Sequence, residues 1–512
     1  ITEAPPHDWR AAAAAGRRIG YDPWLHTPDG LARWRRAAEK GGFELVPVAR
    51  NPIDRVWEDQ PPPPLGPVRP HTEMFTGRSA QDKRMEIAGL LKAAKADAAV
   101  LSLPESIAWL FNIRGADVPR APFPHAFAVL RADATAELFL DRRKMVSELR
   151  SHLGNEVTVQ PPDRLGDALD RLGRDRATVR LDPASAPAWI AERLERAGAA
   201  LDRGADPCLE PKARKNAVEL NGMRAAHLRD GAAVTRFLKW LDGAAPGGQV
   251  DEMTAAAQLE AFRRSNKLIQ DLSFDTISGA GPNGAIVHYR VTAESNRRLE
   301  PENLYLVDSG AQYLDGTTDI TRTIAIGTPS AEMRDRFTRV LKGHIAIATA
   351  LFPRGTTGAQ LDSLARAALW QAGLDYDHGT GHGVGSYLGV HEGPQRISKA
   401  GGGVALAPGM IVSNEPGYYK EGAYGIRIEN LVAVIEVEVP GAEREMLGFE
   451  TITRAPIDRR LVDPGLLTRA EIAWLDDYHA AVRGSLSPLL DEASAAWLAA
   501  ATAPLGEDAA GQ

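Results

Sequence analysis

The stretch HGTGHGVGSYLGVHEGP, residues 378–394, concentrates three histidines and a run of glycines in one short segment. His378 and His382 stand four positions apart, which is the spacing of a metal-binding pair on a helix. The glycines around them argue against a helix, because each glycine lowers helix stability by about 1 kcal/mol relative to alanine. Whether this segment binds a metal therefore depends on ligands elsewhere in the chain.

A pair of carboxylates lies in VDSGAQYLDGTTDITRT, residues 307–323, which reads as two strands joined by a short turn. A hairpin with its loop at residues 312–315 would set Asp308 and Asp319 opposite each other, with both side chains on one face of the sheet. Like charges in that position destabilise a sheet unless a cation lies between them.

A second pair follows the same plan in SNEPGYYKEGAYGIRIEN, residues 413–430, which carries Glu415 and Glu429 on two further predicted strands. Two carboxylate pairs in corresponding places predict one shared cation site. Taken singly, each residue has a simpler explanation, because an Asp before Ser-Gly is usually a turn residue and a lone buried histidine is usually a core residue. The prediction rests on all of these residues together.

The sequence around them excludes other catalytic motifs. GAGPNG, residues 279–284, matches the glycine pattern of a dinucleotide-binding loop, but a predicted strand follows it, so no helix N-terminus would face a pyrophosphate. The DSG at residues 308–310 has no second copy to complete an aspartic-protease pair. The sequence contains no G-x-S-x-G, and Cys208 lies in an apparent linker without a nucleophile motif.

Composition places the chain among globular proteins of more than one domain. Its 512 residues suggest two or three domains, and its net charge of −7 without a basic block makes nucleic acid an unexpected partner. No apolar run approaches the roughly 20 residues that span a bilayer, so no membrane association is expected. Cys208 is the sole cysteine, which excludes an intrachain disulfide and favours a reducing, cytoplasmic location.

The N-terminal region is expected to be the end of a larger domain. The chain opens on Ile1, and its alanine run at residues 11–15 is flanked by Arg10 and Arg17, unlike the apolar core of a secretory signal. Residues 24–48 predict one helix and one strand, which is too little for a domain. QPPPPLGPVRP, residues 60–70, predicts a stiff extended linker. We expect the natural N-terminus to lie outside this sequence.

Two different patterns follow the linker. Residues 79–205 alternate helical segments with short apolar strands, which is typical of an α/β sheet with covering helices. From residue 212 the order becomes two helices followed by antiparallel strands, and this order occurs twice, over about 212–327 and 329–437. Within the second pattern, Asp251, Ser330 and the capping-box pair Thr357 and Gln360 predict helix starts, and strands are predicted at 272–278, 285–289, 303–311, 317–326, 409–415 and 426–436.

These motifs together resemble a known family. VDSGAQYLDGTTDITRT, HGTGHGVGSYLGVHEGP, NEPGYY and GIRIEN are, in this order and spacing, similar to the motifs of the pita-bread metallopeptidases, family M24. IAWLFNIRG, GAIVHY and VLKGHIAIATALFP look like its multidomain, cytosolic-type aminopeptidase P (Xaa-Pro aminopeptidase) branch. The resemblance implies an α/β (α+β) protein with a creatinase-like α/β domain before a pita-bread domain of two pseudo-twofold αβ halves. The expected units are a remnant of an N-terminal α/β domain (1–62), the creatinase/prolidase-like domain (63–210), the catalytic domain (211–452) and a helical extension (453–512).

The resemblance implies that five residues hold two divalent metals. Asp308 would serve one metal, His382 and Glu415 the other, with Asp319 and Glu429 bridging. Four carboxylates offset the charge of two divalent ions, and an oxygen-rich set with one imidazole suits Mn²⁺, with Co²⁺ or Zn²⁺ as alternatives. Two such ions can activate a bridging water or hydroxide for attack while polarising the substrate carbonyl.

The resemblance also implies roles in catalysis and substrate binding. His391 would stabilise the tetrahedral intermediate or shuttle a proton, and His288 would position the substrate near the scissile bond. Glu415 would take a proton from the attacking water. His378 would line the pocket for the residue after the scissile bond.

The resemblance gives roles to two further residues: Arg427 would orient the bridging carboxylates, and Tyr419 would contact the metal-bound oxygen.

The implied activity is removal of the N-terminal residue from peptides with proline in the second position. An Xaa-Pro bond is a tertiary amide without an N–H, so a peptidase that grips that hydrogen fails on it.

Alternatives on the same motifs remain open. A prolidase-like Xaa-Pro dipeptidase would use the same fold and metals but prefer dipeptides. A non-catalytic pita-bread binding module would lack metal ligands, whereas all five are present in this sequence. The resemblance further implies a homodimer when a complete N-terminal domain is present.

Overall fold

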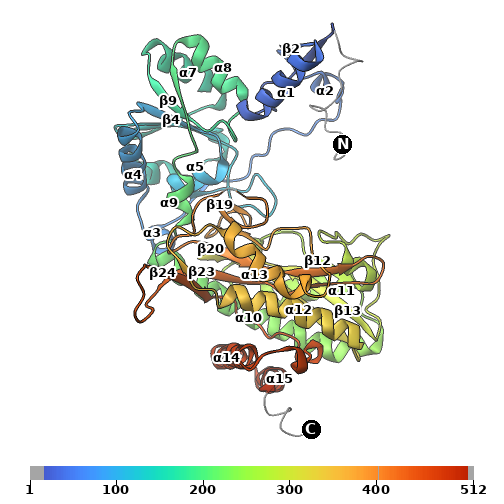
Figure 1. The fold of residues 1–512 in the computed structure, drawn as a ribbon. Coiled ribbons are helices and arrows are strands. Elements are labelled where there is room, and N and C mark those ends of the chain that lie inside the picture. Colours follow the sequence, from blue (N-terminus) through green and yellow to red (C-terminus); the bar gives the residue numbers. More distant parts are fainter. Residues whose placement is uncertain (1–15, 402, 506–512) are drawn as a thin grey trace. The chain divides into compact units, whose positions relative to one another are not determined.

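The computed structural model describes residues 16–401 and 403–505, so Arg10 and the alanine run at 11–15 lie outside the described residues. The chain divides into two compact units, one formed by residues 1–73 and 78–211 and the other by residues 74–77 and 212–512 (Figure 1). None of the described helices is both long and apolar enough to cross a membrane.

The first unit is built on a mixed six-stranded sheet in the order β10-β9-β4-β6-β7-β8. Apolar residues of α7 (Leu165–Arg174) and α8 (Ala188–Ala197) pack on one face, and α4 (Ala80–Ala93) packs on β4 and β6 (Figure 1). The predicted α/β alternation is confirmed. The strands are β4 (Ala98–Leu101), β6 (Phe127–Arg131), β7 (Ala136–Phe139), β8 (Val157–Gln160), β9 (Thr178–Leu181) and β10 (Ala200–Arg203).

Ahead of this sheet, β1 (Arg18–Tyr21) and β2 (Glu44–Pro47) form a parallel pair joined by α1 (Pro28–Gly41). The helix and the second strand agree with prediction, and β1 is an additional strand. α2 (Pro52–Val56) follows, and residues 60–67 form no helix or strand, as expected of a proline-rich linker. The remaining α-helices and strands up to residue 213 are β3 (Arg69–Pro70), α3 (Glu73–Thr76), α5 (Pro104–Leu110), β5 (Ile113–Arg114), α6 (Leu149–Leu153) and α9 (Leu209–Ala213).

The second unit repeats the order of two helices and a set of antiparallel strands. The first half has α10 (Ala217–Ala244), α11 (Glu252–Arg264), β11 (Ile269–Leu272), β12 (Ile277–Ala280), β13 (Asn303–Ser309), β14 (Ala311–Tyr313), β15 (Gly316–Thr317) and β16 (Ile320–Ile326). The second half has α12 (Ala331–Ala348), β17 (Phe352–Pro353), α13 (Gly358–Trp370), β18 (Gly381–Gly383), β19 (Glu392–Ile397), β20 (Ile411–Asn414), β21 (Gly417–Lys420), β22 (Tyr424–Arg427), β23 (Asn430–Val437) and β24 (Met446–Thr451).

Three of these helices begin at the capping residues that the sequence predicts. Asp251 accepts a hydrogen bond from the backbone N–H of Thr254 at 2.8 Å, and Ser330 accepts one from Met333 at 3.2 Å. The Thr357 backbone N–H donates to the Gln360 side chain at 2.8 Å, which gives α13 its capping box. Each cap satisfies amide groups that have no partner inside their helix.

Two strand predictions are corrected by the structure. Residues 285–289 do not form a strand, because residues 281–285 make a 3₁₀ turn that is bonded to a buried carboxylate of α11. The hairpin of the first acidic pair turns at residues 314–315 rather than 312–315, so Asp308 pairs with Thr321 and not with Asp319. This shift is two residues in register, which keeps both carboxylates on one face of the sheet.

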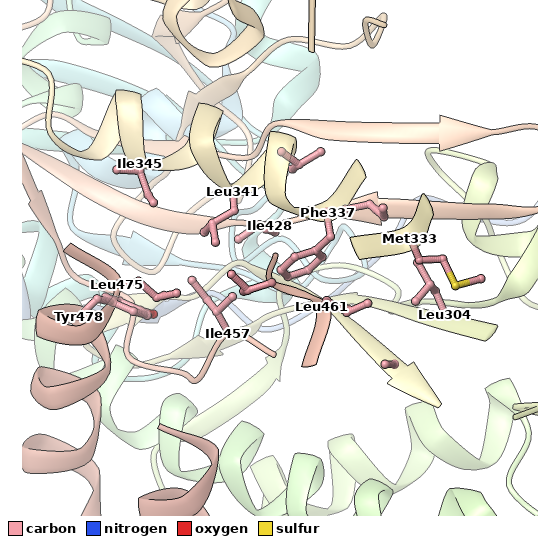
Figure 2. Close-up of a cluster of buried hydrophobic side chains, with 14 of the residues drawn as sticks. Leu304, Met333, Phe337, Leu341, Ile345, Ile428, Ile457, Leu461, Leu475 and Tyr478 are labelled. Carbon is pink, nitrogen blue, oxygen red and sulfur yellow. The ribbon is translucent and has the colours of Figure 1, made fainter. Parts of the chain in front are cut away.

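The helical extension packs against the rest of the second unit through a large apolar cluster (Figure 2). α12 presents Met333, Phe337, Leu341 and Ile345 along one face, at the three- to four-residue spacing of an amphipathic helix. Figure 2 shows this face turned toward Ile457 and Leu461 and toward Leu475 and Tyr478 of α14 (Arg469–Leu486). α15 (Glu492–Ala501) follows, so the predicted extension carries two α-helices within residues 453–505.

Candidate metal and peptide site

The predicted ligands converge where strands of the two halves of the second unit end. Asp308 lies near the end of β13 and Asp319 just before β16, while Glu415 follows β20 and Glu429 precedes β23. Asn414 pairs with Asn430, so the ladder places Glu415 and Glu429 at adjoining ends of two paired strands. The side chains of Asp319, His382 and Glu429 offer ligand atoms that all lie within 4.8 Å of one another.

His382 presents one ring nitrogen to the carboxylates. Its Nε2 lies 3.4 Å from Asp319 Oδ2 and 3.5 Å from Glu415 Oε1. Its Nδ1 lies 2.9 Å from the carbonyl oxygen of Gly383, which can only accept, so Nδ1 keeps its proton and Nε2 becomes free to act as a ligand once it loses its own. The Ser413 hydroxyl donates to Glu415 Oε1 at 3.0 Å and accepts from the His382 backbone N–H at 2.9 Å, which fixes both ligands together.

Arg427 organises the opposite side of the site. Its Nη2 donates to Asp308 Oδ2 at 2.7 Å, and its Nε donates to the Thr321 hydroxyl at 3.1 Å. Thr321 in turn donates to Glu429 Oε2 at 2.7 Å. The buried guanidinium of Arg427 therefore orients Asp308 of the first half directly and Glu429 of the second half through Thr321.

The protein alone leaves this site short of positive charge. Burial raises the pKa of Glu429 well above its usual range, and the nearby charges of Asp319 and Asp308 raise it further. Burial likewise raises the pKa of Asp319 and of Glu415. Burial would lower the pKa of His382, but its contact with Asp319 and the charge of Glu415 raise it to about 9. The site thus favours added protons or added cations.

Metal ions fit this demand better than protons do. Four carboxylates and one imidazole form an oxygen-rich donor set of the kind that divalent first-row ions take. Asp308 Oδ1 is buried and accepts no hydrogen bond within the described part of the chain, which leaves one lone-pair donor without a partner. A buried acceptor without a partner is costly, and a cation would satisfy it.

A chain of hydrogen bonds leads from Arg427 toward His378. Arg427 Nη1 donates to the Tyr419 hydroxyl at 2.6 Å, so the tyrosine proton is left to donate to His378 Nε2, 2.9 Å away. His378 Nδ1 lies 2.8 Å from the carbonyl of Gly379. Burial and the charge of Arg427 lower the pKa of His378 to about 4, in keeping with a neutral ring that accepts at Nε2.

His391 and His288 lie at the same site. The rings of His382 and His391 meet edge to face with centroids 4.3 Å apart. Desolvation and, next, the charge of His382 lower the pKa of His391 to about 4, and the charge of His288 contributes in the same direction. His288 also acts on His378 in this way and has an exposed side chain. All three predicted substrate-side histidines are therefore gathered around the carboxylates.

Buried ionic and polar contacts hold the segments that carry these histidines. Glu392, next to His391, has Oε2 2.7 Å from Lys212 Nζ and Oε1 2.5 Å from Lys215 Nζ, all three side chains being almost fully buried. The His288 segment is tethered by Glu252, whose carboxylate accepts from the amide of Asn283 at 2.9 Å. It also accepts from the Tyr289 hydroxyl at 3.0 Å and from the backbone N–H groups of Ala280 and Arg297.

Glycines allow close backbone contacts at this site, both in residues 378–394 and at Gly310. A Cβ on Gly381 would lie 1.9 Å from the carbonyl oxygen of Ser413, so only glycine allows this segment to lie so close to β20. Gly310 is similar, because a Cβ there would lie 1.9 Å from the Thr318 carbonyl. These contacts bring residues 381–383 beside Ser413 and Glu415.

Several residues of the site were not predicted. Thr321, Ser413, Glu252 and the two lysines Lys212 and Lys215 act through contacts between segments far apart in the chain. Thr321 lies in the motif at residues 307–323. It stands two residues after Asp319, so strand alternation predicts that the two side chains share one face of the sheet. The sequence offered no comparable signal for Glu252 or the lysines.

Three family models match the chain in succession. The Creatinase/Prolidase N-terminal domain matches residues 59–219, metallopeptidase family M24 matches 221–436, and the C-terminal region of peptidase M24 matches 445–505. A probable Xaa-Pro aminopeptidase P of Aspergillus flavus is 41% identical, over 97% of this chain and 78% of its own length. Aminopeptidase P1 of Lotus japonicus is 40% identical, over 95% of this chain and 84% of its own.

A solved structure is similar over almost the whole chain. The X-prolyl aminopeptidase from Caenorhabditis elegans, described as a cytosolic enzyme with a di-nuclear active site, has a TM-score of 0.93 and 35% sequence identity. The match covers 98% of this chain and 83% of that one. The expected combination of a creatinase-like domain and an M24 domain is confirmed by these matches.

Proposed function

The chain belongs to metallopeptidase family M24, and on that premise we propose that it is a metal-dependent aminopeptidase that removes the N-terminal residue from peptides with proline in the second position. The observation that carries this proposal is the convergence of Asp308, Asp319, His382, Glu415 and Glu429 on one buried patch. The names of the relatives and of the similar solved structure support the substrate class.

The family resemblance implies how the ligands divide between two ions. We propose that Asp308 serves one ion, that His382 and Glu415 serve the other, and that Asp319 and Glu429 bridge the two. The Asp308 oxygen without a hydrogen-bond partner and the raised carboxyl pKa values support this assignment. We propose Mn²⁺ as the native ion, with Co²⁺ or Zn²⁺ as alternatives, because the donors are mostly oxygen.

Bound ions would supply a Lewis acid for the scissile carbonyl and would make water a stronger nucleophile. The chain's own residues would supply proton transfer and alignment. We propose that Glu415 accepts the proton that the attacking water loses, and that His391 donates a hydrogen bond to the developing oxyanion or passes a proton to the leaving nitrogen. The proline nitrogen carries no hydrogen, so it must receive a proton before it leaves.

His288, His378 and Tyr419 would hold the substrate. His288 has an exposed side chain beside the other two histidines and would position the residues flanking the scissile bond. His378 would line the pocket for the proline ring, and Tyr419 links it to Arg427. In this structure the Tyr419 proton is directed at His378, so a contact between Tyr419 and the reacting oxygen requires that this hydrogen bond be exchanged.

Several less direct assignments belong to the same proposal. We propose the domain limits 1–62, 63–210, 211–452 and 453–512, which the three matched family ranges support. The cytosolic description of the similar enzyme supports a cytoplasmic location. A homodimer is also proposed, and light scattering of the purified protein would test it.

Hydrolysis of three matched peptides would test the activity. Chelator-stripped protein would be assayed on Arg-Pro-Pro, Arg-Pro and Arg-Ala-Pro, with and without added Mn²⁺. The proposal expects metal-dependent release of free arginine from Arg-Pro-Pro and little from Arg-Ala-Pro. Preference for Arg-Pro would instead identify a dipeptidase, and no cleavage of any peptide by protein with two bound ions would favour a binding module.

A further inference from the structure

A single buried histidine touches both strand ends that present ligands. His344 of α12 is 0% exposed, and its Nδ1 lies 3.1 Å from the carbonyl oxygen of Asn414 and 3.2 Å from that of Ile428. These carbonyls belong to the residues directly before Glu415 and Glu429. His344 therefore contacts the two backbones immediately beside two of the proposed metal ligands, without contacting the ligands themselves.

The hydrogen-bond partners fix the tautomer of this ring. Arg322 Nη2 can only donate, and it donates to Asn430 Oδ1 at 2.9 Å. The Asn430 amide nitrogen therefore faces His344 Nε2 at 3.2 Å and donates to it. The ring proton belongs on Nδ1, where it is shared between the two backbone carbonyls. Burial and the charge of Arg322 also lower the pKa of His344 to about 3, in agreement with a neutral ring.

The position of His344 is fixed from several sides. Asn414 returns a hydrogen bond from its side-chain amide to the His344 carbonyl at 2.9 Å. The neighbouring apolar residues of α12 pack in the cluster of Figure 2, which locks the helix in place. Trp474 of α14 meets the His344 ring edge to face at 5.9 Å, and Tyr478 stacks on Trp474 at 5.4 Å. α14 thus packs against this ring through Trp474.

We propose that His344 is a positioning residue that sets the separation of Glu415 and Glu429 and thereby the affinity of the site for metal, with Trp474 holding its ring. The inference rests on the proposed metal site. When both are ionised, Glu415 and Glu429 repel each other, and the shared Nδ1 proton ties their two backbones together against that repulsion. A ligand set must be held within roughly 0.5 Å of its working geometry to bind well.

His227 offers a matched control. It is also almost fully buried on a long helix, and its Nδ1 bonds a backbone carbonyl, that of Met223, at 2.7 Å. That carbonyl belongs to its own helix and not to a strand that carries a ligand. Loss of His227 therefore reports the general cost of removing a buried histidine.

The experiment compares Mn²⁺ binding and thermal unfolding of wild type, His344→Gln and His227→Gln in the full chain. We expect both variants to unfold at lower temperature, but only His344→Gln to bind Mn²⁺ more weakly, by roughly 10–100-fold, with an altered Mn²⁺ electron paramagnetic resonance spectrum. His344→Asn keeps a donor near the Nδ1 position, so it should recover much of the affinity. Equal Mn²⁺ affinity in wild type and His344→Gln would overturn the inference.

Variants of Trp474 keep the inference testable if His344→Gln does not fold. Trp474→Leu should weaken Mn²⁺ binding in the same direction by a smaller factor. Trp497→Leu on α15, whose ring nitrogen bonds Asp242 instead, should leave binding unchanged. Equal affinity in both tryptophan variants would contradict the role of α14. Failure of wild type itself to bind two ions would contradict the proposed function, which separates the two claims.

Discussion

Arg427 holds Asp308 by one oxygen only: its Nη2 donates to Oδ2 at 2.7 Å, while Oδ1 is buried and has no hydrogen-bond partner within the described residues. The same guanidinium reaches Thr321 on the ligand side and Tyr419 on the substrate side. Arg427 thus connects the proposed metal ligands to the proposed substrate pocket.

Replacing Arg427 by lysine should therefore impair both metal binding and peptide hydrolysis. A lysine keeps the charge but cannot span three acceptors with one planar fork. We expect Arg427→Lys to lower kcat/KM by roughly 10–100-fold and to weaken Mn²⁺ binding, measured by steady-state kinetics and calorimetry. Arg354→Lys, on an exposed arginine paired with Glu436 and Glu445, is the control and should behave as wild type. Unchanged kinetics and metal binding in Arg427→Lys would remove Arg427 from the site.

Asp319→Ala should abolish activity and lower the metal content, because Asp319 is proposed to bridge both ions. Metal analysis after gel filtration, together with the peptide assay, measures both effects. Asp315→Ala is a close control, since Asp315 lies in the same hairpin but pairs with Arg229. Full activity with normal metal stoichiometry in Asp319→Ala would refute the ligand assignment.

Metal affinity should rise with pH up to about 9. His382 has its pKa raised to about 9 in the metal-free protein, so its ring is protonated at neutral pH and must lose that proton to become a ligand. Raised pKa values of Asp319, Glu415 and Glu429 act in the same direction, because an ion competes with protons that these carboxyls retain. Calorimetry in buffers of different ionisation enthalpy should detect proton release on Mn²⁺ binding. Binding without proton release at pH 7 would contradict these shifts.

His391→Ala should reduce kcat by roughly 10²–10⁴-fold if His391 transfers a proton or stabilises the oxyanion. His391 is not a proposed ligand, so the variant should still bind two ions. Kinetics on Arg-Pro-Pro and metal analysis of the same preparation provide the comparison. An unchanged kcat would leave His391 a structural role only.

Glu252→Gln should impair substrate binding through the segment that carries His288. A glutamine offers one acceptor oxygen where the carboxylate of Glu252 receives hydrogen bonds from Ala280, Asn283, Tyr289 and Arg297. We expect KM to rise more than kcat falls. The double variant with His288→Ala should show a coupling of about 0.5–3 kcal/mol, and strictly additive effects would mean that Glu252 does not act through His288.

The parts of the fold that follow from neighbouring residues were predictable from sequence. Asp251, Ser330 and Thr357 cap helices in the structure because capping depends on residues within one turn. The hairpin between Asp308 and Asp319 was predicted with the wrong loop, because alternation fixes which face a side chain takes but allows a shift of two residues.

Contacts between distant segments explain the remaining differences. Residues 285–289 alternate like a strand, yet Asn283 and Tyr289 bond Glu252 of α11, and this tertiary contact overrides the local preference. The hydrogen bonds of Thr321 to Glu429 and of His344 to two carbonyls join residues that are far apart in the chain. The four carboxylates of the site were indicated by their positions on predicted strand pairs and the other site residues by a resemblance, and the structure adds the geometry that connects them.

Anomalous diffraction from a crystal of the Mn²⁺-loaded protein would locate the bound ions. We expect two peaks about 3.5–4 Å apart, one beside Asp308 and one beside His382 and Glu415, with Asp319 and Glu429 between them. A single peak, or peaks away from these five side chains, would contradict a two-metal site built from them.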